Sequence, residues 1–204
     1  MTYAPLNFQS IRNRELKKAF RHANAYLHDV YGMFRLLPPE DGDGGGGNFS
    51  IVLVLLCIVD GLAAEVWPGR QEVPKQENRF KHLIRCRFPW GPEGRGQWVQ
   101  KGNAADQLYS EFRNPLVHEL GRDKTAASRP ADFGEPIIGK WGPLPTEWQD
   151  IAKIDALAAW NDAWPIFSEV EVAGKPSRYK LSAAGLYWTV KHLAREMAQE
   201  AKDL

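Results

Sequence analysis

Arg113 and His118 are the side chains whose types and spacing could do chemistry. They lie five positions apart in residues 104–120, AADQLYSEFRNPLVHEL, with Asn114 directly after the arginine. The planar, permanently charged fork of an arginine matches phosphate oxygens, and a histidine can move a proton near neutral pH. The amide of an asparagine can orient a phosphate or a hydroxyl. Together these groups suffice for metal-independent RNA cleavage, in which a base deprotonates the ribose 2′-OH while a cation stabilises the charge on the phosphate.

The segment that holds these residues has the pattern of an apolar helix interrupted by a proline. Apolar residues recur every four positions, as on one face of an α-helix: Leu108, Phe112, Leu116 and Leu120. On a straight helix Arg113 and His118 would point about 140° apart. Pro115 lies between them and either kinks the helix or opens a new one, which changes their relative direction. Two copies packed in a dimer could also bring the two groups together across the interface.

The spacing alone is weak evidence for catalysis and is compatible with a structural function. An arginine and a histidine within a few residues occur by chance, and Arg21 and His28 form such a pair in a segment with no other sign of chemistry. Salt bridging or helix capping by Arg113 and His118 is therefore the alternative to catalysis.

The motif RNPLVH, preceded by LYSEF and followed by Glu-Leu-Gly, resembles the signature of the HEPN superfamily (higher eukaryotes and prokaryotes nucleotide-binding domains). That signature is an arginine, usually followed by a polar residue, and a histidine after four to six positions, late in a helical domain. Upstream, the runs FSIVLVLLCIVDGLA and ENRFKHLIRCRF look like the two helices that precede the signature in many bacterial HEPN-like proteins. The resemblance covers about residues 49–120.

The resemblance implies a function. In catalytic members of the superfamily the arginine and histidine are ribonuclease residues contributed by both protomers of a dimer, and they match Arg113 and His118, with Asn114 at the polar position. We therefore expect a homodimeric, metal-independent endoribonuclease, in toxin–antitoxin or phage defence, with an antitoxin or defence-system protein as a further candidate partner. Many HEPN-like domains have lost activity, so a non-catalytic dimerisation or partner-binding module is the alternative.

The most basic stretch of the chain precedes this motif. Arg79, Lys81, Arg85 and Arg87 crowd one segment, and nearby glutamates offset them only partly. A solvated charged face and an RNA-contacting face are both compatible with this pattern. The net charge of the whole chain is only +1, so the chain lacks the overall positive charge that would predict tight non-specific binding to nucleic acid.

Composition places the chain among soluble globular proteins. We expect a single helical domain over residues 1–204, with a HEPN-like core at about 10–120 and C-terminal helices at 146–202. The start MTYAPLNFQS lacks the pattern of a signal peptide and the apolar run 49–59 is too short to span a bilayer, so we expect a cytoplasmic protein with no membrane association. Cys57 and Cys86 share no metal-ligand spacing and are expected to be free, buried thiols. No metal site and no cofactor is predicted.

Hydrophobic periodicity predicts an all-α bundle of about five to six helices. The expected helices, besides the one at 104–120, are residues 11–37, 50–66, 75–87, 147–163 and 178–202, with N-caps at Ser10, at Asn48 or Ser50, and at Ser177. Residues 40–48 are read as a linker. The Pro/Gly-rich segment 121–145 is predicted to be an inserted loop with a short β-hairpin around Ile137, Ile138 and Trp141, and could fold over the site as a lid. FSEVEV, residues 167–172, alternates like a strand.

Overall fold

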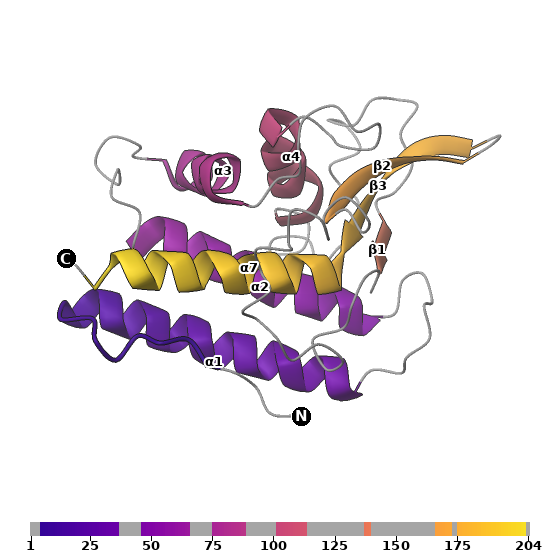
Figure 1. Cartoon of the computed structure of the whole chain (residues 1–204). Helices are drawn as coiled ribbons and strands as arrows, with labels where there is room; N and C mark the ends of the chain where they lie inside the picture. Colours follow the sequence, from indigo (N-terminus) through magenta and orange to yellow (C-terminus); the bar gives the residue numbers. More distant parts are fainter. Residues whose placement is uncertain are drawn as a thin grey trace.

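The structure is a computed structural model, and it describes residues 5–36, 46–65, 75–88, 101–113, 137–139, 166–172 and 175–202. Its described part is mainly helical, with α1 (Arg14–Leu36), α2 (Gly46–Glu65), α3 (Gln76–Arg87), α4 (Lys101–Gln107), the π-helix η1 (Leu108–Arg113) that continues α4, and α7 (Ala183–Glu200) (Figure 1). The predicted helical bundle is therefore confirmed. The helix expected at 147–163 lies outside the described residues.

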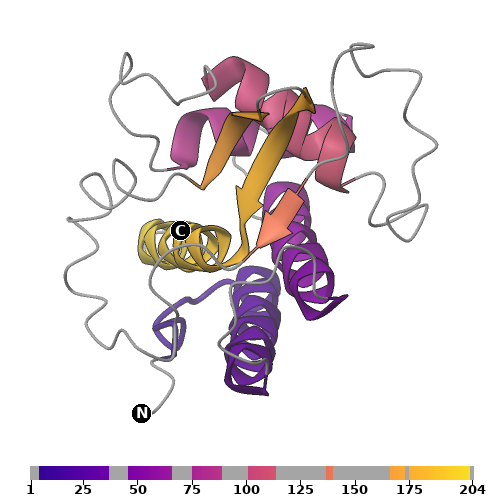
Figure 2. The same cartoon turned by 90° about the vertical axis from the view of Figure 1, so that its right-hand side faces the viewer.

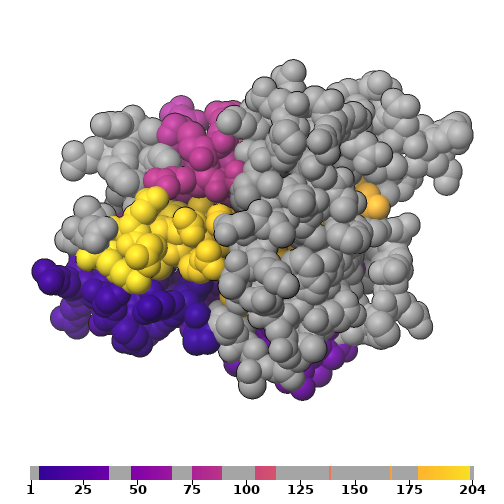
Figure 3. All heavy atoms as spheres, viewed as in Figure 1, coloured from indigo at the N-terminus to yellow at the C-terminus, as the bar shows by residue number. Residues whose placement is uncertain are grey.

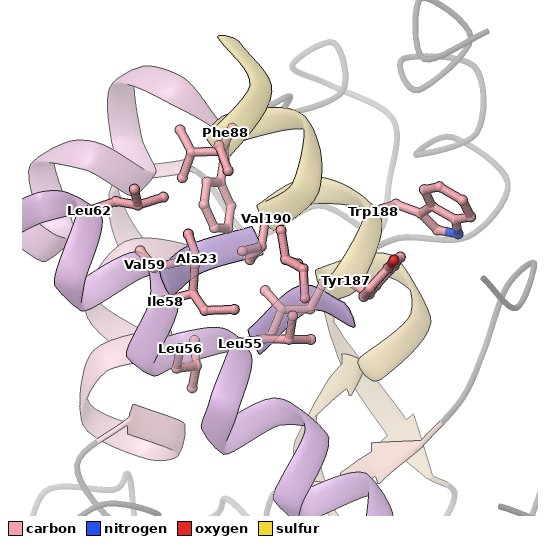
Figure 4. Close-up of a cluster of buried hydrophobic side chains, with 14 of the residues drawn as sticks. Ala23, Leu55, Leu56, Ile58, Val59, Leu62, Phe88, Tyr187, Trp188 and Val190 are labelled. Carbon is pink, nitrogen blue, oxygen red and sulfur yellow. The ribbon is translucent and has the colours of Figure 1, made fainter. Parts of the chain in front are cut away.

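Helix α2 is the central element, and it packs against α1, α3 and α7. It is apolar on most of its surface, so several of its faces can be buried at once. Figure 4 shows Leu55, Leu56 and Val59 of α2 in one cluster with Ala23 of α1 and Val190 of α7. Side chains of α1, α7 and α3 lie next to one another on the face seen in Figure 3. The described helices thus share one hydrophobic core.

Helix α1 has the predicted apolar stripe but a different start. Phe20, Leu27, Val30 and Phe34 are buried as expected. Its cap is Asn13, whose Oδ1 accepts hydrogen bonds from the backbone N–H groups of Glu15 at 3.0 Å and Leu16 at 3.2 Å. The predicted cap at Ser10 was wrong because an asparagine three residues later offers the same kind of acceptor at the point where the backbone becomes helical.

Helix α2 begins earlier than predicted. It starts at Gly46, so Asn48 and Ser50 lie inside the helix and neither is its cap; the last three residues of the expected linker are helical. By length and composition one helix in the described part of the chain, Gly47–Glu65, could cross a membrane, although half of that span is buried within the fold. The helix is therefore longer than the apolar run 49–59, which by itself is too short to span a bilayer.

A small three-stranded sheet lies at one end of the helices (Figures 1 and 2). Its order is β1 (Ile137–Gly139), β3 (Lys175–Ser182), β2 (Phe167–Val172). The predicted strand at 167–172 is confirmed, and β2 forms an antiparallel pair with β3. The predicted hairpin around Ile137, Ile138 and Trp141 lies partly outside the described residues; Ile137 and Ile138 form a strand that pairs in parallel with β3. Alternation in sequence indicates a strand but cannot identify its partner.

The last helix starts five residues later than predicted. Residues 175–182 form β3, and α7 begins at Ala183 with Ser182 as its N-cap, whose Oγ accepts from the backbone N–H of Gly185 at 2.9 Å. Tyr179 and Leu181 are buried while Lys180 between them is half-buried, which is the alternation of a strand. The predicted cap at Ser177 was wrong because a segment of strand precedes the helix.

Candidate functional site

Arg113 is the last residue of η1, and it is the only one of the three predicted catalytic residues in the described part of the chain. His118 and Asn114 lie outside the described residues, as does Pro115. The helix changes at Leu108 from α4 to a π-helix, a form that is rare and occurs frequently at functional sites. The unusual backbone thus coincides with the motif singled out in the sequence.

Asp60 of α2 holds the guanidinium of Arg113. Nη2 of Arg113 donates to Oδ2 of Asp60 at 2.8 Å, and the two side chains are only 14% and 20% exposed. The other carboxylate oxygen, Oδ1, accepts from Nε2 of Gln76 at 2.9 Å, and the same nitrogen donates to the backbone carbonyl of Asp60 at 2.8 Å. Residues from α2, α3 and η1 therefore fix the position of the arginine.

Tyr109 lies close to two cations. Its ring centroid is 5.3 Å from Cζ of Arg113 and 5.2 Å from Nζ of Lys81, distances at which a ring attracts a positive charge. Phe80 of α3 packs edge-on against the same ring, with centroids 5.4 Å apart. The tyrosine is half-buried, and burial is the main reason that its pKa is raised above its ordinary value. It remains a neutral phenol that orders the positive charges around it.

The predicted RNA-contacting residues make ion pairs and hydrogen bonds within α3 and to neighbouring helices. Lys81 bridges Glu77 at 2.5 Å and Asp106 of α4 at 2.9 Å, and Arg85 bridges Asp106 at 2.8 Å. Arg79 donates to Oε1 of Gln76 at 2.6 Å. Arg87 pairs with Glu200 of α7, with one of the two bonds at 3.0 Å. Tyr109 connects Lys81 to Arg113, whereas Arg87 belongs to the contact with α7.

The pKa values of Asp106 and Lys81 follow from this network. Partial burial by itself raises the pKa of the Asp106 carboxyl, but hydrogen bonds and charges from Lys81 and Arg85 more than offset it and lower the pKa below its usual range. Burial lowers the pKa of Lys81, and Glu77 and Asp106 reverse that effect and raise it. Lys81 and Asp106 are therefore both charged at neutral pH and form an ion pair.

Cys57 lies on α2 near Asp60 and Arg113. The prediction of buried thiols was wrong, because both Cys57 and Cys86 are free and exposed. Burial of part of the group and then the charge of Asp60 raise the pKa of the Cys57 thiol, against a smaller opposite effect of Arg113. A thiol with a raised pKa is a poor nucleophile at neutral pH. In the described ranges no three His, Cys, Asp or Glu side chains gather closely enough to hold a metal ion.

The sequence pattern pointed to Arg113 but not to the residues that hold it. Asp60 was visible only as a charged interruption near the end of an apolar helix, and that interruption was the available signal: a carboxylate in such a position needs a partner. Gln76 and Asp106 carried no signal, because a polar residue on a surface helix has many uses. Comparisons of the chain with protein-family models, with curated proteins and with solved structures found no match.

Proposed function

We propose that the protein is a metal-independent endoribonuclease of the HEPN type, with its Arg-x4-His site at a homodimer interface. Arg113 would hold the scissile phosphate, His118 would act as general base or acid, and Asn114 would orient the substrate. A cytoplasmic function in toxin–antitoxin or phage defence fits such an activity. The observation that carries the proposal is the placement of Arg113 at the end of a π-helix, ordered by Asp60 and Tyr109.

The fixed position of Arg113 is favourable for catalysis by charge stabilisation. A cation that is already oriented stabilises developing negative charge without the cost of reorganising at the moment of reaction. Asp60 and Tyr109 restrict the guanidinium before RNA arrives. The side chain is 14% exposed, so a phosphate would have to approach it through this small exposed part. Cleavage would pass through attack of the ribose 2′-OH on the adjacent phosphate, with proton transfer by His118.

A stripe on α2 supports the homodimer. Six residues at helical spacing are exposed or half-buried on one side of this helix, next to Asp60: Ser50, Leu53, Val54, Cys57, Gly61 and Ala64. This α2 stripe is mainly apolar, with Leu53 and Val54 partly buried against the core and Cys57 and Gly61 exposed, and it offers a surface for association. A second copy packed on it by two-fold symmetry would place two Arg113 side chains near one interface. The stripe would then be covered by protein rather than by lipid.

A second candidate function rests on the Arg113–Asp60 ion pair. Both side chains are mostly buried, so the pair could simply connect η1 to α2, as a structural contact does. In that case the protein would be a non-catalytic HEPN-like module that dimerises or binds an antitoxin or defence-system partner.

Purified protein incubated with labelled single-stranded RNA in EDTA distinguishes the two functions. The ribonuclease predicts cleavage that Arg113→Ala and His118→Ala each abolish. Arg113→Lys is the matched variant, because lysine keeps a positive charge beside Asp60 but loses the planar fork; it should stay folded and lose at least about 100-fold in rate. Cleavage that persists in the Arg113 and His118 variants would end the proposal. No cleavage by the wild type, and no toxicity on overexpression, would favour the binding module.

A further inference from the structure

Lys81 and Arg85 share one carboxylate. Oδ1 of Asp106 contacts Nζ of Lys81 at 2.9 Å, and Oδ2 contacts Nη2 of Arg85 at 2.8 Å. The two cations are four residues apart on α3 and therefore lie on the same side of that helix. Asp106 comes from α4, two residues before η1 begins. The two carboxylate oxygens of Asp106 thus contact one cation each, as two oxygens of a phosphate bound between Lys81 and Arg85 would.

This pair of cations lies beside the proposed catalytic arginine. Lys81 and Arg113 are both close to Tyr109, at 5.2 Å and 5.3 Å from the centre of its ring. Because both cations contact one ring, two neighbouring phosphates of a single flexible RNA strand could occupy Arg113 and the position of Asp106. On an α-helix, residues two positions apart point about 200° away from each other, so Arg87 does not face the same side as Arg85. Arg87 pairs with Glu200 of α7 instead.

We propose that Lys81 and Arg85 form a second phosphate-binding subsite beside Arg113, and that Asp106 is the counter-ion that single-stranded RNA displaces from it. The inference rests on the proposed function. It names single-stranded RNA as the substrate class and Asp106 as a residue that inhibits RNA binding. Two of the four basic residues predicted to contact RNA, Lys81 and Arg85, belong to this subsite. Arg79 and Arg87 are bound to Gln76 and Glu200 and do not.

The exposure of the groups makes the displacement feasible. The side chain of Asp106 is 47% exposed and that of Arg85 is 39% exposed. An ion pair such as Arg85–Asp106 contributes only about 0–1 kcal/mol to stability, because water screens it, whereas Lys81 is 18% exposed and less screened. A phosphate offers both a negative charge and oxygens that match a guanidinium. Asp106 and Glu77 balance the charges of Lys81 and Arg85, so the subsite is electrically neutral until Asp106 moves aside and leaves it positive.

Equilibrium binding of fluorescent single-stranded RNA tests the proposal, with His118→Ala as the background so that no RNA is cut. Asp106→Asn keeps the shape of the side chain but removes its charge, and should tighten binding several-fold. Lys81→Gln and Arg85→Gln should each weaken binding and reduce the slope of log affinity against log salt by about 0.7–1. Glu200→Gln is the matched control: it removes the carboxylate paired with Arg87 and should leave RNA affinity unchanged.

The subsite is refuted if Asp106→Asn fails to tighten binding, or if the salt slope stays the same in both the Lys81 and the Arg85 variants. Circular dichroism of every variant confirms that the helices are intact, and the two glutamine variants provide a second measurement should the asparagine variant unfold. Cleavage by the wild type with normal binding by all three variants would leave the ribonuclease standing without this subsite. If RNA binding depends on Lys81, Arg85 and Asp106 but the wild type does not cleave RNA, the subsite is supported and the ribonuclease proposal is refuted.

Discussion

Arg113 and Asp60 depend on each other at the scale of single residues. The guanidinium is ordered by the carboxylate, and the carboxylate is tolerated near the end of an apolar helix because Arg113 and Gln76 satisfy its two oxygens. When the partner of a partly buried charge is neutralised, the charge still bears the free-energy cost of its desolvation but loses the attraction that offset this cost.

Asp60→Asn should therefore destabilise the fold. We expect a loss of about 1–3 kcal/mol in the free energy of unfolding, measured by urea titration, because the charge of Arg113 remains in place without its counter-charge. Asp29→Asn is the control, since Asp29 is an exposed carboxylate on α1 with no such contact described. Equal stability of the Asp60 and Asp29 variants would show that the ion pair contributes nothing to the fold.

Lys191 of α7 is a second charged group in an unfavourable place. It is 4% exposed, its Nζ lies 3.5 Å from the hydroxyl of Tyr187, and the rings of Tyr187 and Trp188 are 5.6 and 5.8 Å away. Burial lowers the pKa of the ammonium from 10.5 to about 8. The unfolded chain holds this proton up to its ordinary pKa, so between about pH 8 and 10.5 the unfolded state binds more protons and the contribution of Lys191 to stability rises with pH.

Lys191→Met should raise the stability at pH 7, where the ammonium is charged in both states and its burial is fully unfavourable. We expect a gain of about 1–3 kcal/mol that shrinks as the pH approaches 10, measured by urea unfolding across this range. Lys18→Met, at an exposed position of α1, should change stability little at any pH. A less stable Lys191→Met protein at pH 7 would mean that the contacts with the two aromatic rings outweigh the cost of burial.

Capping decides where the last helix begins, at the scale of secondary-structure elements. Ser182 is 1% exposed and ends β3, so its hydroxyl accepts a bond from Gly185 at the point where the strand turns into α7. Both Ser177 and Ser182 precede helix-forming residues, and local sequence cannot choose between them. The sheet makes the choice, because pairing of β3 with β1 and β2 keeps residues 175–182 extended.

Ser182→Ala should cost about 1 kcal/mol of stability, because a helix N–H loses its acceptor in a buried position. Ser177→Ala is the matched control and should cost less, since Ser177 lies within β3 rather than at the start of a helix. Thermal melts of the two variants, followed by circular dichroism, provide the comparison. The reverse order of the two melting temperatures would contradict the observed start of α7.

Association through the α2 stripe belongs to the scale of the whole molecule. A Cβ atom added to Gly61 of α2 meets nothing within 4 Å, and the same holds for Gly32 of α1. Gly61 lies within the α2 stripe, whereas Gly32 lies on another helix, so the two glycines offer matched positions for a larger side chain.

Gly61→Gln should leave the monomer folded, with a gain in stability of up to about 1 kcal/mol because glycine is a poor helix former. The added side chain should also break the proposed homodimer and the RNA cleavage that depends on it. Gly32→Gln should give the same gain and leave both intact. Light scattering after size exclusion reports the mass of each variant. A Gly61 variant that is as dimeric as the wild type would exclude the α2 stripe as the interface.

Periodicity predicted most of the helical architecture. The buried stripe of α1 and the limits of α3 followed from local spacing, because an amphipathic helix of this length has one face to bury and its apolar residues mark that face. Element limits were less well predicted: Asn13, Gly46 and Ser182 replace the expected starts of three helices. Where a helix begins depends on which of several similar polar residues lies at the point where tertiary contacts make the backbone helical.

The sequence by itself determined that Arg113 lies in a distinctive motif and that α2 is apolar enough to be central, since residue types and their spacing are local properties. The tertiary structure decided that Asp60 forms an ion pair with Arg113 and that Asp106 forms ion pairs with Lys81 and Arg85. It also decided that β1 pairs with β3 in parallel. Each of these contacts joins segments between 21 and 53 residues apart, or two strands of different parts of the chain. Only the packing of helices around α2 brings such partners together, and no local pattern encodes which of several charged residues will meet.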